Sequence, residues 1–407
     1  MKKRMKTAMA AVLLAAMMLT VCGIGHCEET FAEKALLAAF GDEKAAFIDR
    51  NGKIAFFVDY EKVYNFSDGL AAVEKDGKWG YIDKTGKEIV PCQYDDAYYF
   101  SEERAAVARD GKWGYIDTTG TEVIPCQYNE SWGCVNRFSE GFACVEKDGK
   151  YGYIDKMGAE LIPFQCGDGV IMFFLNAGFS EGLACVEKDG KYGFIDTTGT
   201  ELIPCQYDMV YNFSEGLALV AKNGKFGYID ATGTEVIPCQ YEEDAGDFHD
   251  GLAYVANGEC GYGKYGYIDK TGKEIVPCQY DYNRNIPNYS DGLVRVEKDE
   301  KWGYLDTTGK EAIPCQYDYA YDFSGGFACV CMDDKKGYVD TTGKEVIPCQ
   351  YDTAGENLRF CEGLVRIRKD GKWGYIDTMG KVAIPFLFSE ASDFSEGLAY
   401  VEIGEGK

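Results

Sequence analysis

Residues 66–95 read FSDGLAAVEKDGKWGYIDKTGKEIVPCQYD, and this stretch decides the fold because variants of it fill most of the chain. Three short runs, at 70–75, 78–83 and 88–94, have the alternation and the β-branched or aromatic content typical of strands. Asp76-Gly77 joins the first two runs, and this dipeptide favours a hairpin turn in which both central residues have positive φ. The sequence therefore predicts a three-stranded antiparallel unit. In two units Glu300 and Asp334 replace the glycine, and we expect a different turn there.

The unit recurs along the chain with a basic period of 34 residues, the separation of Trp79 and Trp113. Residues 47–66 match only the second half of a unit, and residues 394–402 match only the first half. A three-stranded unit is marginal alone, so the recurring aromatic residues are predicted to form the core between stacked neighbours. The centre of the complete units carries, in order, Trp79, Trp113, Tyr151, Tyr192, Phe226, Tyr265, Trp302, Lys336 and Trp373.

The core Lys-Trp-Gly-Tyr-Ile-Asp and the flanking Glu-Gly-Leu-Ala-x-Val resemble the WG repeat, also written KWG, of bacterial proteins. The resemblance covers about residues 47–402. It implies an all-β repeat protein that is commonly exported, with no general enzymatic activity and no defined catalytic residues. It names no ligand.

Two architectures agree with this repeat. We expect an all-β fold in which tandem three-stranded β-repeats stack as an open superhelix, or solenoid. The alternative is a closed ten-blade propeller-like ring, in which the two half units at the ends complete one blade. The open form is favoured because propellers usually have four to eight blades of four strands, whereas these units offer three.

The N-terminus predicts a targeting segment. Residues 1–27 form a signal peptide, with a basic start and an apolar stretch at 7–21 that is short for a membrane span. Residues 19–22 partly resemble a lipobox, so a lipid anchor at Cys22 is the alternative. We expect a short N-terminal helix, or cap, at 28–46 and the repeat array at 47–407. No later stretch is long and apolar enough to span a membrane, so no span is predicted after signal removal.

Composition excludes several classes of function. The net charge of −25 disfavours nucleic acid as a partner, because a phosphate backbone would be repelled. Only two histidines, His26 and His249, are present, which leaves little room for histidine catalysis or zinc binding. The aspartate after each aromatic run, such as Asp83, is interpreted as a turn residue. We therefore expect no enzyme, no catalytic residue, no cofactor and no metal.

The cysteines are interpreted as structural. Seven of them, such as Cys92, hold one repeat position at which Phe164 and Phe386 also stand, so we expect a small buried apolar residue there. A disulfide between Cys144 and Cys185 of adjacent units is an alternative for that pair. Cys329-Val-Cys331 is only a weak indication of a metal site.

We therefore predict an acidic, exported, non-catalytic scaffold that mediates protein–protein interaction outside the cell or at the cell envelope. The alternative is a module that binds cell-wall or other glycan. Specificity is expected where the units differ, at the variable position of Ala-x-Val and in the insertions. The candidate interaction residues are Trp132, Ile171, Met172, Phe173, Phe174, Tyr254, Tyr262, Arg295, Arg366 and Tyr400.

Overall fold

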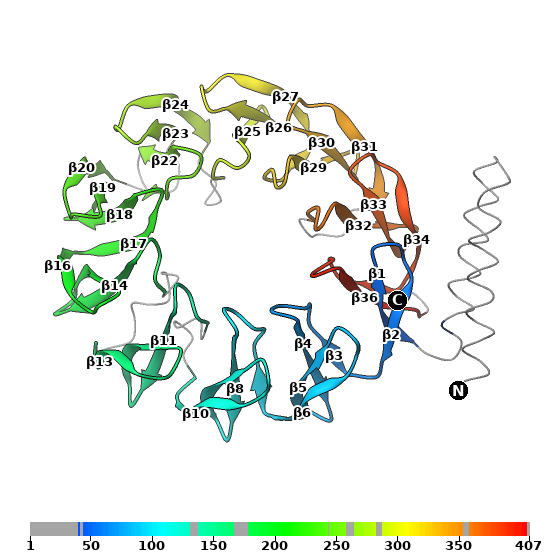
Figure 1. Cartoon of the computed structure of the whole chain (residues 1–407). Coiled ribbons are helices and arrows are strands. Elements are labelled where there is room, and N and C mark those ends of the chain that lie inside the picture. Colours follow the sequence, from blue (N-terminus) through cyan, green and yellow to red (C-terminus); the bar gives the residue numbers. More distant parts are fainter. Residues whose placement is uncertain are drawn as a thin grey trace.

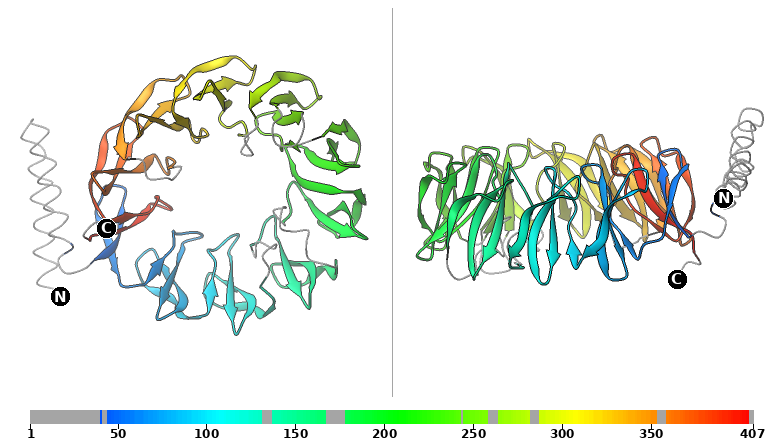
Figure 2. Two further views of the ribbon diagram at one scale, coloured as in Figure 1. Left: turned by 180° about the vertical axis from the view of Figure 1, so that it is seen from behind. Right: turned by 60° about the horizontal axis from the view of Figure 1, so that its bottom comes forward.

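The ten repeats form a closed ring of ten β-sheets (Figure 1). The computed structural model describes residues 40, 44–130, 137–166, 178–242, 244–257, 264–281, 287–352 and 358–404. Turned toward its side, the ring is a flat disc in which the sheets stand next to one another (Figure 2). The expected open superhelix is therefore wrong, and the alternative, a propeller-like ring of ten blades, is confirmed. The signal peptide and nearly all of the expected N-terminal cap lie outside the described residues.

All ten sheets repeat one antiparallel order. The first strands of the blades are β4 (Leu70–Lys75), β8 (Arg104–Arg109), β11 (Phe142–Lys147), β14 (Leu183–Lys188), β18 (Leu217–Lys222), β22 (Leu252–Asn257), β25 (Leu293–Lys298), β29 (Phe327–Met332), β32 (Leu364–Lys369) and β36 (Leu398–Glu402). The middle strands are β5 (Lys78–Asp83), β9 (Lys112–Asp117), β12 (Lys150–Asp155), β15 (Lys191–Asp196), β19 (Lys225–Asp230), β23 (Lys264–Asp269), β26 (Lys301–Asp306), β30 (Lys335–Asp340), β33 (Lys372–Asp377) and β1 (Ala45–Asp49). The strands at the outer rim (Figure 1) are β6 (Glu88–Tyr94), β10 (Glu122–Tyr128), β13 (Glu160–Cys166), β16 (Glu201–Tyr207), β20 (Glu235–Tyr241), β24 (Glu274–Asp281), β27 (Glu311–Tyr317), β31 (Glu345–Asp352), β34 (Val382–Phe388) and β2 (Ile54–Val58).

Six sheets carry a fourth strand that the sequence pattern does not reveal. Most of these strands are two residues long, too short to show an alternation of apolar and polar residues. Each pairs with the first strand of its blade, at the inner edge of the ring. They are β3 (Lys62–Val63), β7 (Asp96–Ala97), β17 (Met209–Ser214), β21 (Asp244–Ala245), β28 (Tyr319–Ala320) and β35 (Glu390–Ala391).

The turn between the first two strands is the same whether or not it contains glycine. Asp76 and Gly77 have φ of +52° and +68°, as the Asp-Gly dipeptide predicts. Glu300 and Asp334 also adopt positive φ, +61° and +58°, so the expected different turn in their units is wrong. A non-glycine residue in this conformation costs about 1 kcal/mol. The strand pairing that the hairpin turn permits stabilises the blade by more than this cost.

The core lies between neighbouring sheets, as the recurring aromatic residues predict. Trp79 and Tyr81 are almost fully buried and pack against Phe100 and Val107 of the next sheet. The Tyr81 hydroxyl also donates a hydrogen bond of 2.8 Å to the carbonyl oxygen of Tyr98 in that sheet. Each blade therefore buries its aromatic face on its neighbour, and this packing stabilises the array.

The glycine that follows each central aromatic residue makes room for backbone. In β6, Val90 pairs with Tyr81 and Tyr94 pairs with Trp79, so three residues bulge opposite Gly80 alone. A Cβ atom on Gly80 would lie 2.4 Å from the Val90 carbonyl oxygen, a separation that no side chain tolerates. The same close approach is found at Gly114, Gly193, Gly227, Gly266, Gly303, Gly337 and Gly374.

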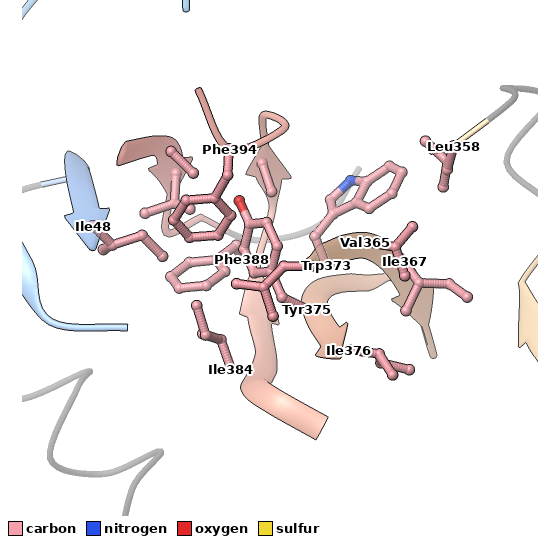
Figure 3. Packing of buried hydrophobic residues seen from close by; sticks show 14 of the residues in the cluster. Ile48, Leu358, Val365, Ile367, Trp373, Tyr375, Ile376, Ile384, Phe388 and Phe394 are labelled. Atoms are coloured by element: carbon pink, nitrogen blue, oxygen red, sulfur yellow. The ribbon is translucent and has the colours of Figure 1, made fainter. Parts of the chain in front are cut away.

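The two chain ends close the ring by strand pairing. The C-terminal β36 pairs with the N-terminal β1, with Phe47 opposite Tyr400. Ile48 of β1 then joins Trp373, Tyr375 and Phe394 in one apolar cluster (Figure 3). The two half units at the ends of the array therefore form one complete blade.

Loop contacts repeat around the ring and cross the closure as well. The Ser67 hydroxyl donates to the Phe100 carbonyl oxygen at 2.7 Å, and Ser395 donates to Phe66 at 2.6 Å across the junction of the two ends. The Glu396 carboxylate accepts a hydrogen bond from the backbone N–H of Gly69. The closing contact is thus the same as the contact between consecutive blades.

Removing residues 394–407 should destabilise the whole ring rather than its last unit. This deletion removes β36 and Phe394, whose buried apolar side chains contribute roughly 4–6 kcal/mol. We expect Tm to fall by roughly 10 °C and protease cleavage to begin within residues 44–58. A chain that ends at Gly404, which keeps β36, is the control. An open array would leave 44–58 protected in both truncated chains.

Candidate functional site

Three exposed tyrosines lie at the inner edge of two neighbouring blades. Tyr64, Tyr98 and Tyr99 are 44 %, 40 % and 39 % exposed, and we name them the inner aromatic surface. Tyr64 follows β3, and Tyr98 and Tyr99 follow β7. Backbone hydrogen bonds from Tyr64 to Ala72 (2.9 Å) and from Tyr98 to Ala106 (3.0 Å) extend these short strands and fix the direction of the side chains.

Two of these tyrosines, Tyr64 and Tyr98, pack against buried tryptophans. The Tyr64 ring stacks on the Trp79 ring with 4.9 Å between centroids, and Tyr98 lies 5.1 Å from Trp113. Both tryptophans are buried, so each tyrosine is held on one face and exposed on the other. Rigid amphipathic rings of this kind lose little conformational entropy when a partner binds.

Charged groups surround the inner aromatic surface. The Arg137 guanidinium lies 5.1 Å from the centroid of the Tyr99 ring. Burial raises the pKa of Tyr98, and the carboxylates of Asp96 and Glu130 raise it further, so its hydroxyl stays a neutral hydrogen-bond donor at physiological pH. The surface therefore offers aromatic rings, phenol hydroxyls, carboxylates and one guanidinium to a partner.

The sequence-predicted candidates that the structure describes lie on other blades than these three tyrosines. Tyr254 is half-buried, and its hydroxyl lies 3.4 Å from Asp244 Oδ2. Tyr400 is half-buried in the closing blade, where its hydroxyl donates to Glu402. The candidates that lie outside the described residues are Trp132, Ile171, Met172, Phe173, Phe174 and Tyr262.

The two candidate arginines join neighbouring blades. Arg295 is 6 % exposed, and its Nε donates to Asp322 Oδ1 of the next blade at 2.8 Å. Its second nitrogen donates to the Tyr319 hydroxyl and the Ala320 carbonyl oxygen, and the guanidinium lies 5.1 Å from the Trp302 ring centroid. Arg366 makes the same contacts two blades further along the chain. Its Nε donates to Asp393 Oδ1, and its second nitrogen donates to the Ala391 carbonyl oxygen. These arginines are thus positioned to hold blades together.

The repeated polar residues serve the fold. Asp83 Oδ1 accepts hydrogen bonds from the Thr85 hydroxyl (2.6 Å) and from the backbone N–H of Thr85 and Lys87, so its interpretation as a turn residue is confirmed. The Thr85 hydroxyl bond lowers the pKa of Asp83. Across the described part of the chain, no three His, Cys, Asp or Glu side chains are grouped so that they could hold a metal ion.

Among the described residues, the repeat-position cysteines are thiols rather than disulfides, and so are Cys144 and Cys185, for which a disulfide was the alternative. They are half-buried rather than buried: the Cys92 Sγ lies 3.8 Å from the Val73 carbonyl oxygen, to which it donates. Burial raises the pKa of Cys92, which keeps the thiol protonated and inert.

The sequence pattern does not predict the inner aromatic surface, because its residues lie outside both the variable position of Ala-x-Val and the long insertions. A signal was present in the segment between the third run of one unit and the Phe-Ser of the next. There the chain reads VYN at 63–65 and AYY at 97–99. Only the short strands β3 and β7 turn these residues into an inner edge.

Comparison with known proteins identifies the repeat. The family model described as WG containing repeat matches residues 46–79, 79–113, 113–151, 151–192, 192–226, 226–259, 265–302, 302–335, 337–373 and 373–407. No curated protein matches the chain. In the described residues, no helix has the length and apolar character needed to cross a membrane.

Several solved structures are similar at low sequence identity. A eukaryotic initiation factor is 13 % identical, with 75 % of this chain and 95 % of that chain covered and a TM-score of 0.46. BamB from Moraxella catarrhalis is 12 % identical over 88 % of this chain and 98 % of that chain, with a TM-score of 0.37. Apo AztD from Citrobacter koseri is 11 % identical over 89 % and 99 %, with a TM-score of 0.33. Likeness at this level says nothing about a shared activity or partner.

Substituting Arg295→Ala should lower stability. The change leaves Asp322 without its cation at a half-buried site, and we expect the free energy of unfolding to fall by about 2 kcal/mol in urea titrations. Lys78→Ala, which removes an exposed ion pair with Asp95, is the control and should change nothing measurable. Unchanged stability of the Arg295 variant would show that this arginine does not hold the blades together.

Asp247 should make stability depend on pH. Its Oδ1 atom is buried without a hydrogen-bond partner, and burial raises its pKa above 3.8, against the opposing effect of His249. A raised pKa means that the folded state favours the protonated carboxyl. Protonated Asp247 therefore stabilises the fold relative to the charged form, and this stabilisation is lost as the pH rises from the unfolded-state pKa through the folded-state pKa. We expect Asp247→Asn to be more stable than the wild type at pH 7, with the difference vanishing near pH 3.

Urea unfolding of both proteins between pH 3 and 8 measures this effect. Asp59→Asn is the control, because the Asp59 side chain is almost fully exposed. A stability difference at Asp247 that is equal at all pH values would contradict the prediction.

Proposed function

Because the chain belongs to the family of WG containing repeats, we propose that it is a non-catalytic scaffold that binds a protein partner at the inner aromatic surface. The carrying observation is the group of exposed tyrosines, Tyr64, Tyr98 and Tyr99, of which Tyr64 and Tyr98 pack against buried tryptophans. Aromatic anchors with one ordered face are the residues that contribute most at protein interfaces.

The negative charge of the chain and of its inner aromatic surface favours a partner with positive charge. The chain carries a net charge of −25, and Asp96 and Glu130 lie beside the inner aromatic surface. A partner that offers lysine or arginine around an apolar centre complements this surface and associates faster at low ionic strength. Nucleic acid does not complement this surface, because its phosphates carry the same negative charge as the protein.

We also propose that the protein acts outside the cytoplasm, in the extracellular space or at the cell envelope. The support is the basic and apolar character of residues 1–27, which is typical of a secretory signal peptide. The ring would thus be a bacterial secreted scaffold. Its repeated serines and aspartates are engaged in structural hydrogen bonds, which supports a role without catalysis.

The test compares variants of residues 28–407 in capture of crosslinked partners from envelope and culture fractions. We expect the triple substitution of Tyr64, Tyr98 and Tyr99 by serine to reduce capture of a specific protein at least about tenfold, a loss of about 1.4 kcal/mol. The matched control is Met157→Thr with Met379→Thr, which removes two side chains that are 71 % and 80 % exposed elsewhere. Equal capture by both variants would place the binding site away from the tyrosines.

Glycan binding is the second candidate, because the same exposed tyrosines offer aromatic ring faces to sugar rings. It predicts quenching of tyrosine and tryptophan fluorescence when a neutral cell-wall polysaccharide is added, with the quenching lost in the triple variant. A flat titration removes this candidate and leaves the protein partner.

A further inference from the structure

Two junctions between blades are held by an arginine and an aspartate, and a third junction has the aspartate without the arginine. At the first two, Arg295 donates to Asp322 and Arg366 donates to Asp393, both at 2.8 Å. Each of these aspartates directly precedes the buried aromatic residue that opens the next blade. Around the ring this position holds, in chain order, Asn65, Tyr99, Arg137, Gly178, Asn212, Asp247, Asn288, Asp322, Arg359 and Asp393. Asp247 is therefore the third aspartate at this position.

Strand pairing shows that Asp247 occupies the same place in its blade as the other two aspartates. Each of the three lies two residues after an alanine that pairs with the fourth residue of the first strand; these pairs are Ala245–Val255, Ala320–Val330 and Ala391–Val401. The carbonyl oxygens of Ala320 and Ala391 accept the second hydrogen bond of the arginine. Ala245 and Asp247 thus stand where the other two junctions have both acceptors of a guanidinium.

The residue that would supply the cation is a leucine at this junction. In the preceding blade the third residue of the first strand pairs with a buried tyrosine, and the corresponding pairs are Leu219–Tyr228, Arg295–Tyr304 and Arg366–Tyr375. Leu219 is buried and carries no charge. Asp247 Oδ1 is buried without a hydrogen-bond partner. Burial raises the pKa of this carboxyl, and His249 acts in the opposite direction. The junction therefore keeps the carboxylate and lacks the arginine.

A second carboxylate and two tyrosines surround Asp247 beside the inner-edge strands β17 and β21. The Tyr254 ring fills the space over Gly246, where a Cβ atom would lie 2.2 Å from a ring carbon. The Tyr254 hydroxyl lies 3.4 Å from Asp244 Oδ2. Burial raises the pKa of Tyr211, in the preceding blade, and the nearby carboxylates of Asp244 and Asp247 raise it further. All four of these side chains are partly exposed, so a ligand in solution can reach them.

We propose that Asp247 and Asp244, with the rings of Tyr211 and Tyr254, bind a guanidinium group that comes from outside the chain. Carboxylates accept charge-assisted hydrogen bonds from a guanidinium, and the faces of aromatic rings attract it.

The chain contains this recognition twice within itself. The Arg295 guanidinium contacts Asp322 and lies 5.1 Å from the centroid of the Trp302 ring, and the Arg366 guanidinium lies 5.2 Å from that of Trp373. The proposed site lies on other blades than the inner aromatic surface, so it does not depend on the function proposed above.

The test is isothermal titration calorimetry of residues 28–407 at pH 7 and low ionic strength with two guanidinium probes. Methylguanidinium represents a free small cation, and Nα-acetyl-arginine N-methylamide represents an arginine of a polypeptide. We expect saturable binding of one equivalent, at least about tenfold tighter than that of Nα-acetyl-citrulline N-methylamide, the neutral analogue of the second probe. Binding of the capped arginine identifies a polypeptide side chain as the source, and binding of methylguanidinium alone identifies a free cation.

Matched variants separate this site from the general attraction of cations to an acidic protein. Asp247→Asn should weaken binding at least about tenfold, whereas Asp59→Asn removes the same charge from an almost fully exposed carboxylate and should leave binding unchanged. Leu219→Arg should abolish binding, because it supplies the cation from within the chain as Arg295 does. The triple serine variant of the inner aromatic surface should bind as the wild type does.

The comparison of the two aspartate variants decides even if Leu219→Arg does not fold, because Asp247→Asn is expected to be more stable than the wild type at this pH. Failure of both probes to bind the wild type, or equal affinities of Asp247→Asn and Asp59→Asn, would overturn the proposal.

Discussion

The close contact between Gly80 and the bulged outer strand is the constraint on which the ring depends. The chain must leave the outer rim at Tyr94 and enter the inner edge of the next blade at Asp96. Before this crossing, the backbone of Val90, Pro91 and Cys92 passes over Gly80, where no Cβ atom fits. This bulge lets Tyr94 still pair with Trp79 while the extra residues are taken up. Proline is tolerated there because a strand at the edge of a sheet needs no donor at every residue.

Blades are then joined by one repeated set of contacts. The aromatic face of each blade packs on its neighbour, and the serine of each loop reaches the next phenylalanine carbonyl. Because Ser395 makes the same bond to Phe66, the closure between the chain ends is equivalent to other junctions. A closed array leaves no terminal blade with an exposed apolar face, which an open superhelix would have to cap.

Residues that follow the repeat pattern form the blades and their junctions. Single residues that replace the usual residue of a repeat position make other kinds of contact. Arg295 and Arg366 replace apolar residues and become ion pairs between blades. Lys336 replaces an aromatic residue and lies opposite a thiol. Tyr64 and Tyr98 share a repeat position with Tyr211 and Tyr321, which are half-buried. Together with Tyr99, the exposed Tyr64 and Tyr98 give one sector of the inner edge an exposed aromatic character. A repeat protein of this kind can acquire a site without changing its fold.

The sequence by itself determined the unit: its three strands, its Asp-Gly turn, its aspartate turn and its aromatic core, because these depend on neighbours within about thirty residues. It also showed that the two half units are complementary. Only the tertiary structure decided that the ends meet, because closure depends on the small angle between successive blades, which no local pattern encodes. For the same reason it alone placed the arginines between blades and the tyrosines at the inner edge. Two-residue strands such as β7 leave no period in the sequence, and they exist only because the first strand of the blade offers them a partner.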